Sequence, residues 1–226
     1  MRIFSNLLVA SLLLWGGAVY ADDDDREAFN ENIKAEQESK LSLFIGGEIG
    51  YAAALLGTTS NATNGATTSD FRVPYGVVGG KAGIIGFFGE KKRTGLRGYV
   101  SYHYSSDGEY YSHQTAFNAE AIWKLGRKFG IYAGLGVGYA HNASIESSNI
   151  ATNNTNTTTL ITEPKGSGFI LPVNIGFEVA LDTHHTVSVN VRGSTIAASE
   201  RLGAANGTTT YSARNILLTV GYAYQF

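Results

Sequence analysis

Two pairs of residues in the first half of the chain have the types that an enzyme could use. His103 and Ser105 stand two positions apart, which places both side chains on one face of a β-strand. A serine esterase would need a carboxylate behind that histidine; the predicted phase points His103 inward, and we expect no such carboxylate there. Asp107 and His113 flank a short predicted loop and could resemble the Asp–His pair of a protease. Such pairs arise by chance where Ser and Tyr are abundant, so we predict that the protein is not an enzyme.

The adjacent histidines His184 and His185 are a candidate metal site. Neighbouring side chains in a turn at the end of a strand point apart, and no third ligand is evident near them. The chain contains no Cys, which excludes disulfides, thiolate nucleophiles and thiolate metal sites. We therefore predict neither a metal site nor a cofactor.

Charged residues recur on one predicted face of several strands. The alternation predicts that seven of these side chains point inward: Glu48, Lys81, Arg97, Glu120, Lys124, Glu178 and Arg192. Opposite charges in a narrow interior most simply pair with one another, because an unpaired buried charge is costly; the alternative is a path for ions or protons. The sequence leaves open which basic residue pairs with Glu120. Charge is otherwise sparse, at 16% of residues with a net charge of −2, which argues against a nucleic-acid partner.

The elements that must position these residues are strands in which polar and apolar side chains alternate. From Leu41 onward the alternation predicts eight strands, at about 41–53, 72–88, 94–105, 112–125, 129–141, 168–181, 187–192 and 211–226. Polar loops at 54–71, 106–111, 142–167 and 198–210, all of them long except 106–111, alternate with tight turns at 89–93, 126–128 and 182–185. This asymmetry, with aromatic residues near both strand ends, is typical of outer-membrane barrels. The predicted fold is therefore all-β, an eight-stranded antiparallel transmembrane β-barrel.

The last strand has the clearest pattern in the chain. Its apolar face runs from Ile216 through Leu218 and Val220, and then ends in aromatics: Tyr222, Tyr224 and Phe226. An apolar outer face that ends the chain on an aromatic residue suits the strand that closes a transmembrane barrel. These three aromatic residues also resemble the signal that the barrel assembly machinery reads, so we assign them that role.

The first forty residues lack this alternation. Arg2 and the apolar run from Leu7 to Val19, followed by Tyr20 and Ala21, predict a signal peptide at 1–21 that is cleaved after Ala21. Residues 22–40 are acidic and predict a periplasmic segment, either a solvated tail with partial helix or a short helix that docks on a partner or on the barrel. The predicted domains are thus 1–21, 22–40 and a barrel at 41–226, and the predicted location is the bacterial outer membrane.

Several segments resemble the barrel domain of the Helicobacter outer membrane protein family, the Hop-type and related proteins. They are the basic turn in Phe87–Arg97, the strand and His-rich turn in Leu171–Thr186, and the closing strand Arg214–Phe226. The resemblance implies an outer-membrane barrel in a family that includes adhesins and proposed porins. The large extracellular region of its adhesins has no counterpart in this chain, and no site residues carry over.

Three functions fit these observations. The first is a structural or surface-interaction barrel with an adhesion-like role, since polar loops can present adaptable hydrogen-bonding groups to outside partners. The alternatives are a small porin or ion channel and an outer-membrane lipid-modifying enzyme. The expected partners are outer-membrane lipid and lipopolysaccharide, the barrel assembly machinery, and an unidentified host or surface ligand.

Overall fold

A computed structural model of the chain describes residues 41–60, 67–88, 93–152, 155–204 and 207–226. The predicted signal peptide, its cleavage point and the acidic segment 22–40 lie outside the described residues, as does most of the basic turn at 89–93. Residues from Leu41 to Phe226 form one compact unit. In the described residues, no helix is long and apolar enough to span a membrane.

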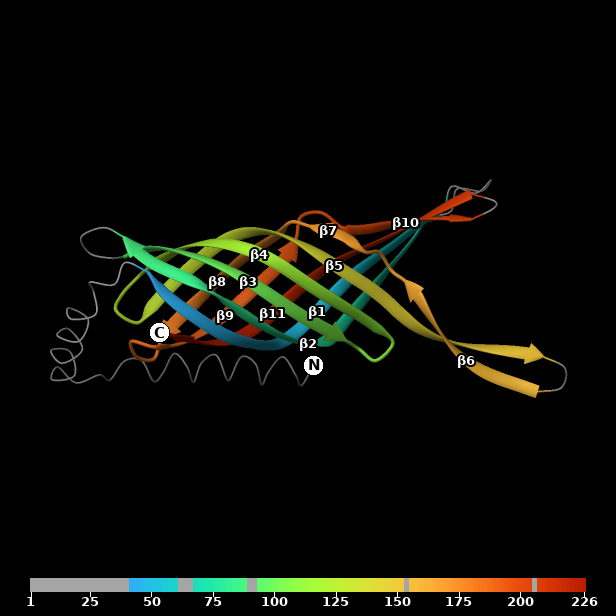
Figure 1. Cartoon of the computed structure of the whole chain (residues 1–226), viewed down its shortest axis with the longest axis horizontal. Coiled ribbons are helices and arrows are strands. Elements are labelled where there is room, and N and C mark those ends of the chain that lie inside the picture. The colour runs from blue at the N-terminus through green and yellow to red at the C-terminus, as the bar shows by residue number, and fades with distance from the viewer. Residues whose placement is uncertain (1–40, 61–66, 89–92, 153–154, 205–206) are drawn as a thin grey trace. The chain divides into compact units, whose positions relative to one another are not determined.

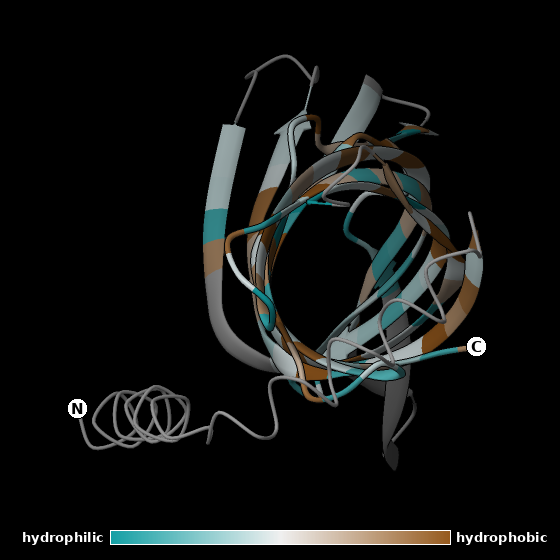
Figure 2. Ribbon diagram, turned by 90° about the vertical axis from the view of Figure 1, so that its left-hand side faces the viewer, coloured by the Kyte–Doolittle hydropathy of each residue, from teal (hydrophilic) through white to brown (hydrophobic). Residues whose placement is uncertain are grey.

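Eight antiparallel strands form a closed ring in this unit (Figures 1 and 2). In ring order they are β1 (Ser42–Ser60), β2 (Thr67–Phe88), β3 (Thr94–Ser106), β4 (Tyr110–Lys124), β5 (Phe129–Thr152), β8 (Pro172–Ala180), β9 (His185–Ser194) and β11 (Gly207–Gln225). The ring closes where β1 pairs with β11, from Phe44 opposite Gln225 to Ser60 opposite Thr209. Closure leaves no sheet edge inside the membrane, where an unpaired backbone group would be costly. The predicted fold class is confirmed.

Three further strands extend the ring at one end. They are β6 (Thr155–Pro164), which pairs with the end of β5, β7 (Gly168–Ile170), which pairs with the middle of β5, and β10 (Ala198–Ala204), which pairs with β11. Figure 1 shows β6 and the end of β5 running well beyond the ring as a hairpin. The prediction of irregular loops at 54–71, 142–167 and 198–210 is therefore wrong over most of their length. Thr-rich segments have a high strand propensity, and a ribbon with both faces in water needs no alternation of polar and apolar residues.

The two ends of the barrel differ in their connections. At one end, which we call the turn end, short turns join β4 to β5 and β8 to β9; Leu125 N–H donates to Phe129 O at 2.9 Å and Leu181 N–H to His185 O at 2.8 Å. The chain also finishes here, where Phe226 N–H donates to Leu43 O at 2.9 Å. The opposite end, with the strand extensions, we call the loop end.

Exposure along the strands is inverted relative to a soluble protein. Large apolar side chains point outward, as in Phe117 and Leu135, which are 67% and 68% exposed, whereas Glu120 beside them is 2% exposed. Outward aromatic residues gather toward both ends, with Tyr51, Tyr102, Tyr104 and Tyr139 near the loop end and Phe88, Trp123, Phe129 and Tyr222 near the turn end. An apolar band between two aromatic girdles is the surface that a bilayer solvates.

Candidate functional site: a closed and charged lumen

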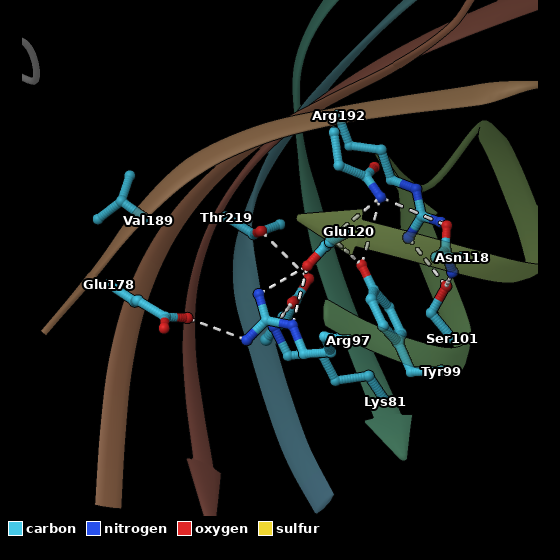
Figure 3. A network of polar contacts seen from close by, with 12 residues as sticks. Lys81, Arg97, Tyr99, Ser101, Asn118, Glu120, Glu178, Val189, Arg192 and Thr219 are labelled. Carbon is cyan, nitrogen blue, oxygen red and sulfur yellow. Dashed lines mark hydrogen bonds and ion pairs between the residues drawn. The ribbon is translucent and has the colours of Figure 1, made fainter. Parts of the chain in front are cut away.

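Arg97 is the centre of the larger of two ion-pair groups inside the barrel (Figure 3). It points inward from β3 and donates from Nε and Nη2 to Glu120 Oε2 of β4, at 2.9 and 2.6 Å. Its Nη1 donates to Glu178 Oε2 of β8 at 2.9 Å. Tyr99 O–H donates to the second oxygen of Glu120, and the Tyr132 ring centre lies 4.8 Å from the guanidinium carbon. One guanidinium therefore joins three strands and forms ion pairs with two carboxylates.

Glu48 is the centre of the second group. From β1 it accepts a hydrogen bond from Lys81 Nζ of β2 at 2.5 Å and another from Thr219 Oγ1 of β11 at 3.2 Å. His103 Nε2 of β3 lies 2.9 Å from Glu48 Oε2. Because β1 and β11 form the closing seam, Glu48 and Thr219 join the first and last strands inside the lumen as well as through the backbone.

Arg192 of β9 links the two groups through neutral side chains, because Asn174 Nδ2 lies 3.4 Å from Asn118 Oδ1, an acceptor of Arg192, and 3.2 Å from Glu120 Oε1. Its guanidinium donates to Ser101 Oγ at 2.9 Å and to Asn118 Oδ1 (Figure 3). It also lies 3.2 Å from His103 Nδ1. Arginine can only donate, so Nδ1 is the acceptor and the ring proton sits on Nε2, which donates to Glu48. This pattern fixes a neutral His103 between an arginine and a carboxylate.

Two clusters of buried apolar and aromatic side chains pack around the polar groups of the lumen. Toward the turn end lie Phe44, Ile85, Tyr99, Ile122 and Tyr132, each at most 7% exposed. Toward the loop end lie Ala52, Ala54, Leu56, Val77, Tyr110, Ala213 and Leu217, again each at most 7% exposed. Together with the ion pairs, these side chains fill the lumen, as expected for a ring of eight strands. We call the two clusters the turn-end cap and the loop-end cap.

The glycines of β5 could have left an open cleft along one wall, but side chains from neighbouring strands fill that space. A Cβ added at Gly134 would lie 2.4 Å from Glu120 Cγ, and one at Gly136 would lie 2.6 Å from Asn118 Oδ1. On β8, a Cβ at Gly176 would lie 2.5 Å from the Tyr132 hydroxyl. The missing side chains therefore make room for the ion-pair network, as eight strands enclose only enough space for side chains.

Six of the seven charged residues expected in the lumen meet in this network. The seventh, Lys124, lies at the turn end of β4, where its Nζ is 3.7 Å from the ring centre of Phe87. The sequence interpretation did not include Tyr99, Ser101, His103, Asn118 and Thr219 among the network residues. All five occupy inward positions of their strands, so alternation alone could have found them, but nothing in the sequence shows which charge each one contacts.

The two pairs with enzyme-like residue types take other roles. The expectation that His103 has no carboxylate behind it is wrong, because Glu48 is there. However, Arg192 holds the other ring nitrogen, which a serine nucleophile would need. Asp107 Oδ1 accepts the backbone N–H groups of Glu109 and Tyr110 in its loop, at 2.9 and 2.6 Å.

The His-rich turn packs against the end of the closing strand. His184 Nδ1 lies 2.8 Å from Gln225 O, His185 Nδ1 contacts the Tyr222 hydroxyl, and the Tyr224 ring stacks on His184 with centres 5.7 Å apart. The turn itself is held by Asp182, whose carboxylate accepts the N–H groups of His184 and His185 at 2.8 and 2.7 Å. These backbone hydrogen bonds, that of His184 first, hold the pKa of Asp182 below its usual value.

The sequence of residues 79–226 matches the model of the Helicobacter outer membrane protein family. The chain belongs to this family. The barrel accordingly lies in the outer membrane of a bacterium, and its turn end is the periplasmic end, since short turns face the periplasm in such barrels. No protein with a curated description matches the chain.

Solved outer-membrane barrels are similar to the chain at low identity. Neisserial surface protein A is 12% identical, with a TM-score of 0.47, over 83% of this chain and 100% of that one. The attachment invasion locus protein Ail of Yersinia pestis is 11% identical, with a TM-score of 0.42, over 81% and 98%. The outer membrane protease OmpT of Escherichia coli is 9% identical, with a TM-score of 0.43, over 82% and 97%. Similarity at this level says nothing about activity.

Proposed function

We propose that this protein is a closed barrel that anchors an extracellular, strand-built surface for interaction with an outside partner. The observation that carries the proposal is the contrast between the two halves of the molecule. The lumen is filled by ion pairs and by two clusters of buried apolar and aromatic side chains, whereas three pairs of strands continue past the ring at the loop end. Regular structure outside the membrane contributes nothing to spanning it, so we assign it to function.

The β5–β6 hairpin is the part of this surface best suited to binding. It is paired from Ala143 opposite Pro164 to Thr152 opposite Thr155. Among the described residues β6 pairs with β5 alone, so its second edge carries backbone donors and acceptors that an extended segment of a partner could use. The residues between 146 and 162 are mostly Ser, Asn and Thr. We infer an adhesion-like role in which the partner adds a strand to β6.

The test is surface display of the full-length protein in a bacterium that does not adhere on its own. Replacing Glu146–Ile161, which are paired residues of the hairpin, by a two-residue turn should abolish binding of the displaying cells to cultured host cells. A matched control shortens the β1–β2 extension between Thr59 and Thr67, which are also paired, and should retain binding. Equal binding by all three versions, at equal surface levels, would contradict the proposal.

Neither alternative function is supported as well. The two apolar caps argue against a small porin or ion channel, and the arginine on His103 Nδ1 argues against an esterase that acts on lipid. Signal-peptide cleavage after Ala21, recognition of Tyr222, Tyr224 and Phe226 by the barrel assembly machinery, and contact with lipopolysaccharide belong to the same proposal. A mature N-terminus at another residue would contradict the first of these.

A further inference from the structure

Two histidines face one another on the outer surface of the barrel, near the loop end. His113 of β4 and His141 of β5 are direct cross-strand partners, so their Cβ atoms stand about 5 Å apart on one face. The two rings are stacked, with centres 6.4 Å apart and planes 30° apart. His141 is exposed and His113 is half-buried. The sequence does not reveal this pair, because the two residues are 28 positions apart and only the register brings them together.

Each histidine is held through the same ring nitrogen. Tyr102 Oη of β3 lies 2.6 Å from His113 Nδ1, and Ser167 Oγ lies 2.8 Å from His141 Nδ1. A hydroxyl oxygen can accept the Nδ1 proton of either ring, which leaves Nε2 with a free lone pair. Metal-bound histidines in proteins are oriented in this way by a second contact to the other nitrogen.

Aromatic rings hold His113 from three sides. The ring centres of Tyr104 and Tyr111 lie 5.0 and 5.6 Å from it, and that of Tyr102 lies 6.1 Å away. Tyr111 also contacts His141, with ring centres 6.2 Å apart. A ring packed among three tyrosines keeps a narrow range of rotamers, so the pair is ordered before any ligand arrives and loses less entropy on binding.

The ligand that suits this pair is a divalent transition-metal ion. A metal–nitrogen bond is about 2.0–2.1 Å, so two rings that bind one ion have centres at most about 6 Å apart, and a small rotation of either side chain closes the present gap. Imidazoles select Cu²⁺, Ni²⁺ and Zn²⁺, whereas Ca²⁺ and Mg²⁺ prefer oxygen ligands. The described residues contain no group of three or more His, Cys, Asp or Glu side chains that could hold a metal ion. A site here would therefore have two protein ligands and positions open to water.

We propose that His113 and His141 form a two-histidine site that binds one exchangeable Cu²⁺, Ni²⁺ or Zn²⁺ ion at the outer surface of the barrel, with Tyr102 and Ser167 as positioning residues. The remaining coordination positions of such an ion are open. They are free for water or for a donor atom on another molecule.

The experiment is calorimetric titration of the full-length folded protein, purified in detergent without a polyhistidine tag, with Cu²⁺. The wild-type protein should bind one ion more than His113→Gln/His141→Gln. Each single change, His113→Gln or His141→Gln, should weaken that site at least about tenfold, and Tyr102→Phe should weaken it about 10–100-fold. Tyr104→Phe is the matched control for Tyr102→Phe and should leave the affinity unchanged. Retained heat-modifiable mobility on gels verifies that each variant is folded.

Three results would overturn the site. Equal stoichiometry in the wild type and the double variant would show that no ion binds there. Sensitivity to only one of the two histidines would exclude a shared ion. Loss of the ion in His184→Gln/His185→Gln but not in His113→Gln/His141→Gln would place it at the turn end instead. Mg²⁺ titrated in the same way should give no heat that depends on His113 or His141.

Discussion

At the scale of single residues, the lumen depends on Arg97 more than on any other side chain. Glu120 takes two of its hydrogen bonds and Glu178 takes one. The side chains of Arg97 and Glu120 are 5% and 1% exposed, whereas that of Glu178 is 10% exposed. Removing Glu120 would leave Arg97 with Glu178 as its remaining counter-charge, but it would take a buried charged acceptor away from Arg97 and Tyr99.

Glu120→Gln should therefore lower the free energy of unfolding by about 1.5–3 kcal/mol. Glu178→Gln should lower it less, because Arg97 keeps its two bonds to Glu120. The measurement is guanidinium unfolding of the refolded barrel in lipid vesicles. Arg97→Met combined with Glu120→Gln should cost less than the sum of the single changes; strict additivity would show that the two side chains do not interact.

The inward-facing glycines of β5 lie against side chains of the neighbouring strands. A Cβ at Gly134 would lie 2.3 Å from Ala119 O and 2.4 Å from Glu120 Cγ, and the backbone oxygen cannot move away freely. Gly134→Ala should cost about 1–3 kcal/mol of stability, as overpacked cores do. Gly98→Ala, on the outer face of β3 with its nearest contact 4.0 Å away, is the control and should be nearly neutral in the same unfolding assay.

At the scale of elements, the β5–β6 hairpin has a buried root. Asn142, Ala143 and Ser144 are each at most 1% exposed. Asn142 donates to Gly166 O at 2.5 Å and accepts from Tyr110 O–H at 2.8 Å and from Asn215 Nδ2 at 2.9 Å. The root thus belongs to the barrel, although the sequence predicts one continuous polar loop across it.

The place of a deletion should therefore decide its effect on stability. Removing residues between Glu146 and Ile161 should leave the unfolding temperature nearly unchanged. Removing 142–167 should lower it clearly, since each buried polar group left without a partner costs about 1–3 kcal/mol. Thermal unfolding followed by circular dichroism measures both. Equal unfolding temperatures for the two deletions would show that Asn142 and its contacts contribute little.

The turn between β8 and β9 gives a prediction about pH. Because its backbone hydrogen bonds lower the pKa of Asp182, the charged carboxylate stabilises the folded turn above the unfolded value of about 3.9. That contribution is lost as the pH falls through the lower pKa of the folded state. Asp182→Ala should lower the unfolding temperature at neutral pH and match the wild type in strong acid, and Asp182→Asn should retain part of the effect through its oxygen. A gap between wild type and Asp182→Ala that is the same at both pH values would contradict this account.

At the scale of the whole molecule, alternation was enough to predict the barrel. Lipid outside and packed polar groups inside impose a period of two on every strand. The sequence alone therefore indicates that Phe117 faces outward and Glu120 faces inward. The extent of the strands could not be predicted this way, because beyond the membrane both faces meet water. Residues 145–164 carry a Thr-rich pattern with no phase, and only their pairing in space makes them a hairpin.

The sequence was enough to predict which charged residues line the lumen, but not which of them pair with one another. Each inward charge was identifiable, yet Glu48 pairs with Lys81 of the adjacent strand, and Arg97 reaches Glu178, 81 residues away in sequence, through the interior. Contacts across a barrel depend on stagger and on side-chain length, which alternation does not encode. The cross-strand pair His113 and His141 depended on register for the same reason.

The caps give the last prediction, which concerns conductance. Buried side chains fill the lumen beside the ion pairs and include Tyr132 toward the turn end and Tyr110 toward the loop end, at 2% and 0% exposure. In planar bilayers at high salt, the monomeric protein should show no porin-sized steps, because barrels with an aqueous channel need about 16–18 strands. Tyr110→Ala alone should also be silent, since the turn-end cap and the Arg97 ion pairs still close the path. Tyr110→Ala combined with Tyr132→Ala should give at most brief, small openings, because Arg97 keeps its carboxylate partners across the middle. Steady porin-sized conductance from the unaltered monomer would show that the caps separate in the membrane, and it would replace the interaction surface with a pore as the function of this barrel.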